Sequence, residues 1–146
     1  MSVIGGPARR GVLAWLGAVA VAPGLSGCAT GPDPDRLIRV RCTVVFFGGS
    51  KLDPEAALVV RLQDVSRMDV PAVVLVERRI RVGERLPPFH FEFGVEPERI
   101  DARSRYTVAA RVEVGARLVY INDTAYPVLT QGAGDDVRLV LKRVSP

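Results

Sequence analysis

The sequence predicts a small all-β domain, an antiparallel β-sandwich of about seven or eight strands, with a closed β-barrel as the alternative. From residue 37 onward, apolar and polar residues alternate in short runs, which is the pattern of strands half-buried in a sheet. Clusters of Gly, Pro, Asp and Ser separate these runs at intervals of about 8 to 12 residues, as turns do in sandwiches and barrels. After Cys28, no stretch has the periodicity of a helix longer than one turn.

The chain before this domain is organised like a secretory signal peptide. Arg9 and Arg10 are its only charges, and an uncharged, mostly apolar run follows over residues 11–21. Pro23 and Gly24 then interrupt this run before it reaches the roughly 20 apolar residues that a membrane-spanning helix needs. The alternatives are an uncleaved short anchor and a buried core helix.

Residues 25–28 (Leu-Ser-Gly-Cys) resemble the lipobox of bacterial lipoproteins, in which a branched apolar residue and two small residues precede a cysteine. The resemblance implies cleavage between Gly27 and Cys28, with acyl chains attached to Cys28. The predicted divisions are therefore a signal peptide at residues 1–27, a lipidated tether at 28–36 and the β domain at 37–146. Ala29 stands where an aspartate would resemble an inner-membrane retention signal, so we expect the protein on the periplasmic face of the outer membrane.

The charge distribution argues against a nucleic-acid partner. Of the formal net charge of +4, Arg9 and Arg10 belong to the signal peptide. The remaining basic residues are scattered along the strands without interleaved aromatic residues, so no nucleic-acid binding is expected.

Once Cys28 is lipidated, Cys42 has no partner for an intramolecular disulfide. It lies on the apolar face of a strand, where a small buried hydrophobe is expected and a reactive thiol is the alternative.

The first half of the domain contains four predicted strands. Residues 37–47 place Ile, Val, Cys, Val and Phe at alternate positions before a Gly-Gly-Ser turn. Residues 57–63 alternate in the same way, and a polar connection leads to a third strand at 71–82 that is most apolar at its start. Residues 89–95 place three phenylalanines on one face, with His90 and Glu92 on the other.

The second half begins with a single helical turn predicted at 97–101, followed by four more strands. The expected strands are 106–114, 117–121, 126–130 and 137–144. Gly115-Ala116 makes a tight turn between the first two. Pro127 removes a backbone donor, which suits an edge strand or a bulge.

The sequence lacks the residue sets of the common catalytic and metal sites, so neither an enzyme nor a metal or other cofactor is expected. His90 is the only histidine, and no Gly-x-Ser-x-Gly motif or phosphate-binding loop is present. The alternative is that Asp64, Asp69 and Asp123 meet in the fold to bind calcium or to act as acid and base. The simpler interpretation is that these aspartates shape their own turns and that Arg67 pairs with the first two.

Three stretches, at residues 58–67, 86–91 and 122–130, resemble in order and spacing the YbaY family of envelope lipoproteins. That family is grouped with the YscW-type type III secretion lipoprotein chaperones, or pilotins. The resemblance runs from about residue 38 to residue 144, and the family's lipidated cysteine corresponds to Cys28. It implies a non-enzymatic β-sandwich on an acyl tether that binds or chaperones another envelope protein, such as a secretin-type subunit.

Polar residues in the first and third of these stretches are the candidate site. We expect them to form either a hydrogen-bonded corner of the fold or a binding patch: Asp64, Ser66, Arg67, Asp123, Thr124 and Tyr126. The alternative function is the binding of a small ligand or a glycan.

Overall fold

The computed structural model of the protein describes residues 31, 35–47 and 51–145. The predicted signal peptide, the cleavage site at Gly27 and Cys28, and most of the tether lie outside these residues. Within the described ranges, no helix combines the length and the apolar character required to cross a bilayer.

The described residues form eight strands and one short 3-10 helix, which confirms the all-β prediction. In chain order they are β1 (Ile38–Phe46), β2 (Ala57–Asp64), β3 (Val73–Arg81), β4 (Phe89–Val95), η1 (Pro97–Arg99), β5 (Tyr106–Val114), β6 (Arg117–Ile121), β7 (Tyr126–Val128) and β8 (Asp136–Arg143). Each strand is within two residues of its predicted bounds. The largest differences are at Pro71 and Ala72, which precede β3, and at residues 129–130, which follow β7.

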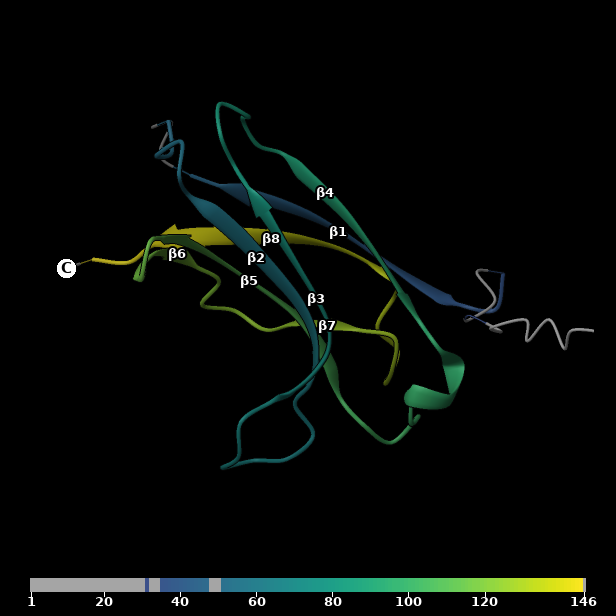
Figure 1. The fold of residues 1–146 in the computed structure, drawn as a ribbon. Coiled ribbons are helices and arrows are strands. Elements are labelled where there is room, and N and C mark those ends of the chain that lie inside the picture. The colour runs from purple at the N-terminus through teal and green to yellow at the C-terminus, as the bar shows by residue number, and fades with distance from the viewer. Residues whose placement is uncertain (1–30, 32–34, 48–50, 146) are drawn as a thin grey trace, which may run out of the picture.

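The strands are hydrogen-bonded in the order β3-β2-β5-β6-β8-β1-β4, and β7 pairs with the first half of β5. Only two residue pairs, Tyr120 with Arg143 and Ile121 with Lys142, join β6 to β8. This narrow junction divides the sheet into two layers, one containing β3, β2 and β5 and the other β8, β1 and β4, inclined to each other (Figure 1). No pairing joins β3 to β4 in this sheet, so the molecule is a sandwich closed on one side and open on the other.

One strand pair departs from the purely antiparallel arrangement that was predicted. β1 and β8 run parallel, from Arg41 opposite Asp136 to Phe46 opposite Leu141. Hairpins produce antiparallel neighbours, whereas these two strands are the first and last of the domain and no hairpin connects them.

The core fills the space between the layers with alternate residues of nearly every strand. Cys42 is one of these buried residues, as predicted. The largest fully buried side chains include Phe93, Leu58, Leu62, Leu139 and Leu141. Burying each such side chain stabilises the fold by about 1.5–3 kcal/mol. β3 is the exception, because none of its nine residues is buried.

One end of the domain carries the connection toward the N-terminus, and we call it the tether end. β1 begins there at Ile38, opposite the end of β4 at Val95. η1 leads from β4 into β5, and the β2–β3 connection lies at the same end (Figure 1). The side chain of Arg36, just before β1, forms an ion pair with Glu98 of η1 at 2.6 Å.

Candidate functional site

The open side of the sandwich is a seam between the edges of β3 and β4. Among the strands that the structure describes, β3 pairs only with β2, and β4 pairs only with β1. An edge strand carries a row of backbone N–H and C=O groups that no neighbouring strand satisfies. Two such edges therefore border the seam.

At the tether end, next to the seam, a cleft of about 550 Å³ lies between the start of β3 and η1. One wall comes from the β2–β3 connection and the start of β3, and the other from η1 and the residues that lead into β5. The lining residues are Asp64, Ser66, Arg67, Val70, Pro71, Val73, Leu75, Arg99, Ser104 and Tyr106. A second cleft, of about 490 Å³, lies between Val65, Arg105 and the 130–133 turn and shares Tyr106 with the first.

Asp64 and Ser66 fix the corner at the base of the cleft. The Asp64 carboxylate accepts hydrogen bonds from the Ser66 N–H at 2.7 Å and from the Ser66 hydroxyl. The Ser66 Oγ in turn accepts the Arg105 N–H at 2.8 Å, and the Val65 N–H donates to the Arg105 carbonyl at 2.8 Å. The hydroxyl of Ser66, followed by its N–H and the nearby Arg67 charge, lowers the pKa of Asp64, so the carboxylate is ionised at neutral pH.

Tyr106 holds the opposite wall in place. Its ring is buried, and its hydroxyl accepts the Asp101 N–H at 2.9 Å. The same hydroxyl donates to the Arg99 carbonyl at 3.4 Å. The backbone that carries the Arg99 side chain is therefore tied to the first residue of β5.

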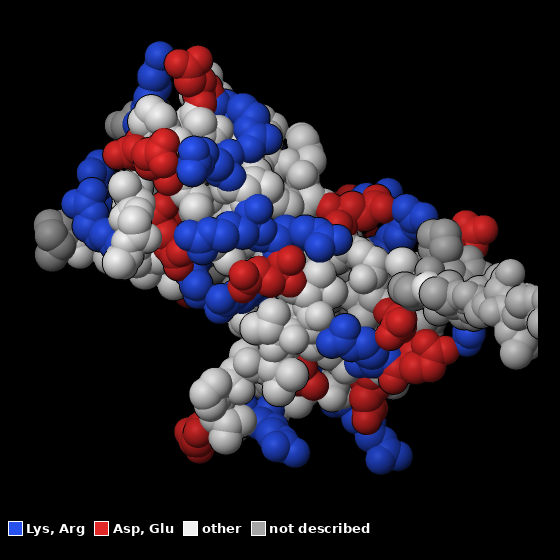
Figure 2. Space-filling view, viewed as in Figure 1, with Lys and Arg blue, Asp and Glu red and all other residues white. Residues whose placement is uncertain are grey.

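The β3 wall is apolar and exposed. Met68 is 79% exposed and Val73 is 62% exposed, and Val70 and Val74 are also well exposed. We call these four residues the apolar strip. In Figure 2, basic side chains form a band across the region where β2 and β3 lie, and uncharged surface continues from it toward the β2–β3 connection. Single exposed apolar residues are ordinary, whereas several of them near a cleft are typical of an interaction site.

The other candidate residues lie elsewhere. Asp123 forms an ion pair with Lys142 at 2.6 Å, and the hydrogen bond between them lowers the pKa of Asp123 and raises that of Lys142. The Thr124 hydroxyl bonds to Asp123 at 3.2 Å. Tyr126 accepts the Val140 N–H at 2.9 Å through its hydroxyl, which ties β7 to β8. These three residues line neither cleft, and their contacts place them in the corner between β6, β7 and β8.

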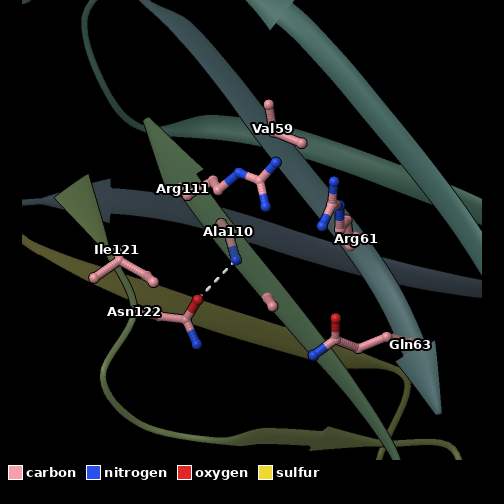
Figure 3. A pocket seen from close by; sticks show the side chains of 8 residues that line it. Val59, Arg61, Gln63, Ala110, Arg111, Ile121 and Asn122 are labelled. Atoms are coloured by element: carbon pink, nitrogen blue, oxygen red, sulfur yellow. Dashed lines mark hydrogen bonds between the residues drawn. The ribbon is translucent and has the colours of Figure 1, made fainter. Parts of the chain in front are cut away.

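A third concavity, on the outer face of β2 and β5, is smaller, at about 90 Å³ (Figure 3). Three of its polar side chains are already engaged. Asn122 accepts the Ala110 N–H at 2.8 Å, Arg61 pairs with Glu77 at 2.5 Å, and Arg111 pairs with Glu113 at 2.5 Å.

Residues suited to metal or nucleophilic chemistry are dispersed. Within the described ranges, no group of three or more His, Cys, Asp or Glu side chains could hold a metal ion. Burial raises the pKa of Cys42 to about 12, with a smaller contribution from Asp136. His90 lies on the outer face of β4, with its Nδ1 3.1 Å from the Thr43 hydroxyl.

Of the residues that line the cleft, Asp64, Ser66 and Arg67 belong to the candidate site predicted from the sequence, and the others do not. The apolar residues that begin β3 and the arginine of η1 were not singled out. For β3, the third predicted strand contained a signal that it is an edge strand. Arg78 lies between Val76 and Ile80 in the alternating apolar series, and a charged residue at a core-facing position is typical of an edge strand.

Comparisons with known proteins agree on one family. A family model described as type III secretion system lipoprotein chaperone (YscW) matches residues 36–141. The lipoprotein YbaY of Escherichia coli (strain K12) is 36% identical over 81 residues, which are 56% of this chain and 43% of that relative. The match therefore spans less than half the length of YbaY. A solved structure, an alternative pilotin from the type II secretion system of Vibrio cholerae, superposes with a TM-score of 0.71 at 32% identity. That match covers 75% of this chain and 99% of the pilotin.

Proposed function

Because the chain belongs to the YscW family of type III secretion system lipoprotein chaperones, we propose that it is a lipid-anchored, non-enzymatic envelope protein that binds and chaperones another envelope protein. The proposed partner is a secretin-type ring subunit, and the proposed location is the periplasmic face of the outer membrane. The observation that carries the proposal is the superposition on the V. cholerae pilotin, which covers nearly all of that protein.

In this proposal, acyl chains on Cys28 supply the membrane attachment. One acyl chain binds a bilayer only marginally, and each buried methylene adds about 0.8 kcal/mol, so two or three chains anchor a protein stably. The residues from Cys28 to Arg36 span at most about 30 Å when fully extended. Arg36, which immediately precedes the tether end of the domain, therefore stays within about 30 Å of the membrane surface.

The cleft is the proposed partner site. It combines two residues of the apolar strip, Val70 and Val73, with two arginines, Arg67 and Arg99. Its corner is held by hydrogen bonds between backbone and side chains. A prearranged cleft of this kind loses little conformational entropy when a partner segment binds.

The test uses the native cell envelope. The affinity-tagged lipoprotein is crosslinked in cells, purified and examined for a secretin-type subunit. In cells that lack the lipoprotein, membrane fractions are examined for the location of the same subunit. We expect the subunit to co-purify and, in the deletion strain, to be depleted from the outer membrane. An unchanged outer-membrane level together with the absence of any crosslinked envelope protein would refute the proposal. The matched control is Cys28→Ser, which should retain binding and lose membrane attachment.

A further inference from the structure

We infer that the partner segment binds as an extended strand paired with the free edge of β3, and that it carries an acidic residue flanked at two-residue spacing by apolar residues. This inference rests on the proposed function and specifies how the open seam takes its partner. Three features support it: an incomplete core beside β3, an arginine without an ion pair in that gap, and further unpaired arginines in the cleft.

The core is incomplete along β3. Val76 pairs with Leu62 and Ile80 pairs with Leu58, and both leucines are fully buried. Directly paired residues point to the same side of a sheet, so Val76 and Ile80 face the core. Both are nevertheless only half-buried, because no strand within the described residues pairs with the other edge of β3. On β4, across the seam, three of the four core-facing residues, Phe89, Phe93 and Val95, are buried, and Phe91 is half-buried. An added strand would therefore cover more apolar surface by pairing with β3 than with β4.

Arg78 would make pairing with the free edge of β3 selective for the residue that lies opposite it. It pairs with the buried Val60, so its side chain projects on the core-facing side of β3 between Val76 and Ile80, and it is exposed. An inward charge on an edge strand discourages indiscriminate pairing with other strands. A strand whose residue opposite Arg78 is a carboxylate would compensate that charge, because directly opposed side chains lie about 4.5–5.5 Å apart.

The other charges of β3 are already paired. Glu77 binds Arg61, Arg79 binds Glu113 at 2.9 Å, and Arg81 binds Glu55 at 3.5 Å. In the described part of the chain, by contrast, three arginines along the seam and its cleft take part in no ion pair: Arg67, Arg78 and Arg99. The charge complementarity of the seam is therefore to an acidic segment.

The register of β3 defines the segment. Successive core-facing positions of β3 are Val76, Arg78 and Ile80, so an added strand needs an apolar, an acidic and an apolar residue at every second position. The alternate positions face solvent and are free to be polar. Main-chain hydrogen bonds would supply affinity, and the acidic residue would supply specificity.

The test uses the lipidated protein in detergent and fluorescent ten-residue peptides. One peptide has the core Val-Thr-Asp-Thr-Val, a second has Val-Thr-Lys-Thr-Val, and a third has the residues of the first in scrambled order. Fluorescence anisotropy gives the affinities, and amide hydrogen exchange locates the binding. We expect the acidic peptide alone to bind and to slow exchange in residues 73–81. Binding of the scrambled peptide with equal affinity, binding of none of the three, or slowed exchange confined to other strands would overturn the inference.

Two variants make the test specific. Arg78→Glu replaces attraction to the acidic residue by repulsion and should lower the affinity for the acidic peptide at least about fivefold. The lysine peptide should bind to this variant instead. Arg138→Glu, at an exposed β8 position opposite Thr43 of β1, is the matched control and should change neither affinity. Retained acidic-peptide binding in Arg78→Glu would overturn the inference. If the Arg78→Glu protein still captures the envelope partner in cells, the extended-strand inference fails while the proposed function stands.

Discussion

Removing the Ser66 hydroxyl tests how the corner of the cleft is held. Ser66→Ala deletes the hydroxyl donor to the Asp64 carboxylate and the acceptor of the Arg105 N–H. A hydrogen bond to a charged group contributes about 1.5–3 kcal/mol and a neutral one about 0.5–1.5 kcal/mol. Because the corner is only half-buried, the lower end of each range applies. The expected loss in the free energy of unfolding is about 2 kcal/mol at pH 7.

The loss should depend on pH. The pKa of Asp64 is lowered in the folded protein from its ordinary value of 3.8, first by the Ser66 hydroxyl. A lowered folded-state pKa stabilises the protein above the ordinary value, and this stability disappears as the pH falls through the folded-state value. The difference between wild type and Ser66→Ala should therefore be largest near neutrality and shrink below about pH 4, leaving the part due to Arg105.

Urea denaturation monitored by circular dichroism measures both effects. A loss of about 2 kcal/mol corresponds to a shift of about 1 M in the urea midpoint for a domain of this size. The matched control is Thr124→Ala, which removes a hydroxyl bonded to Asp123 in an exposed turn and should change stability by less than about 0.5 kcal/mol. An equal effect of both substitutions, or a Ser66→Ala loss independent of pH, would show that the Asp64 corner does not stabilise the cleft.

Three further predictions concern other parts of the chain. Cys28→Ser should move the protein from the membrane fraction to the supernatant after ultracentrifugation, and continued sedimentation with membranes would contradict lipidation. In that variant, Cys42 should not react with a thiol reagent at pH 8 until urea unfolds the protein, because burial raises its pKa to about 12; rapid labelling of the folded protein would contradict this. Tyr126→Phe leaves the Val140 N–H without its acceptor and should cost about 1 kcal/mol in urea denaturation, and an unchanged midpoint would mean that the bond is not needed.

The strands could be predicted because each is encoded locally. In β5, Tyr106, Val108, Ala110 and Val112 alternate with polar or small residues, and each of the four is buried. The predicted third strand is too long at its start, because it includes Pro71, which lies before the first residue of β3, Val73. Local alternation identifies a strand more securely than the residue at which it begins.

The order of the strands depends on contacts that are distant along the chain, and no local pattern encodes them. The parallel pairing of β1 with β8 joins residues 41 and 136. The open seam follows from that order, because β3 and β4 stand at its two ends. The sequence therefore pointed to Asp64, Ser66 and Arg67 as a local corner without indicating that they border a cleft.

The parallel pairing of β1 with β8 also governs the route by which the domain folds. Hairpin neighbours such as β2 and β3 can associate early, because few residues separate them. β1 can pair with β8 only once the last strand of the domain is in place. Folds dominated by such distant contacts form in milliseconds to seconds, more slowly than those built from local contacts. Until β8 arrives, Leu139 and Leu141 are missing from the core and one edge of β1 has no neighbour. The first strand of the domain is thus among the last to acquire both of its neighbours.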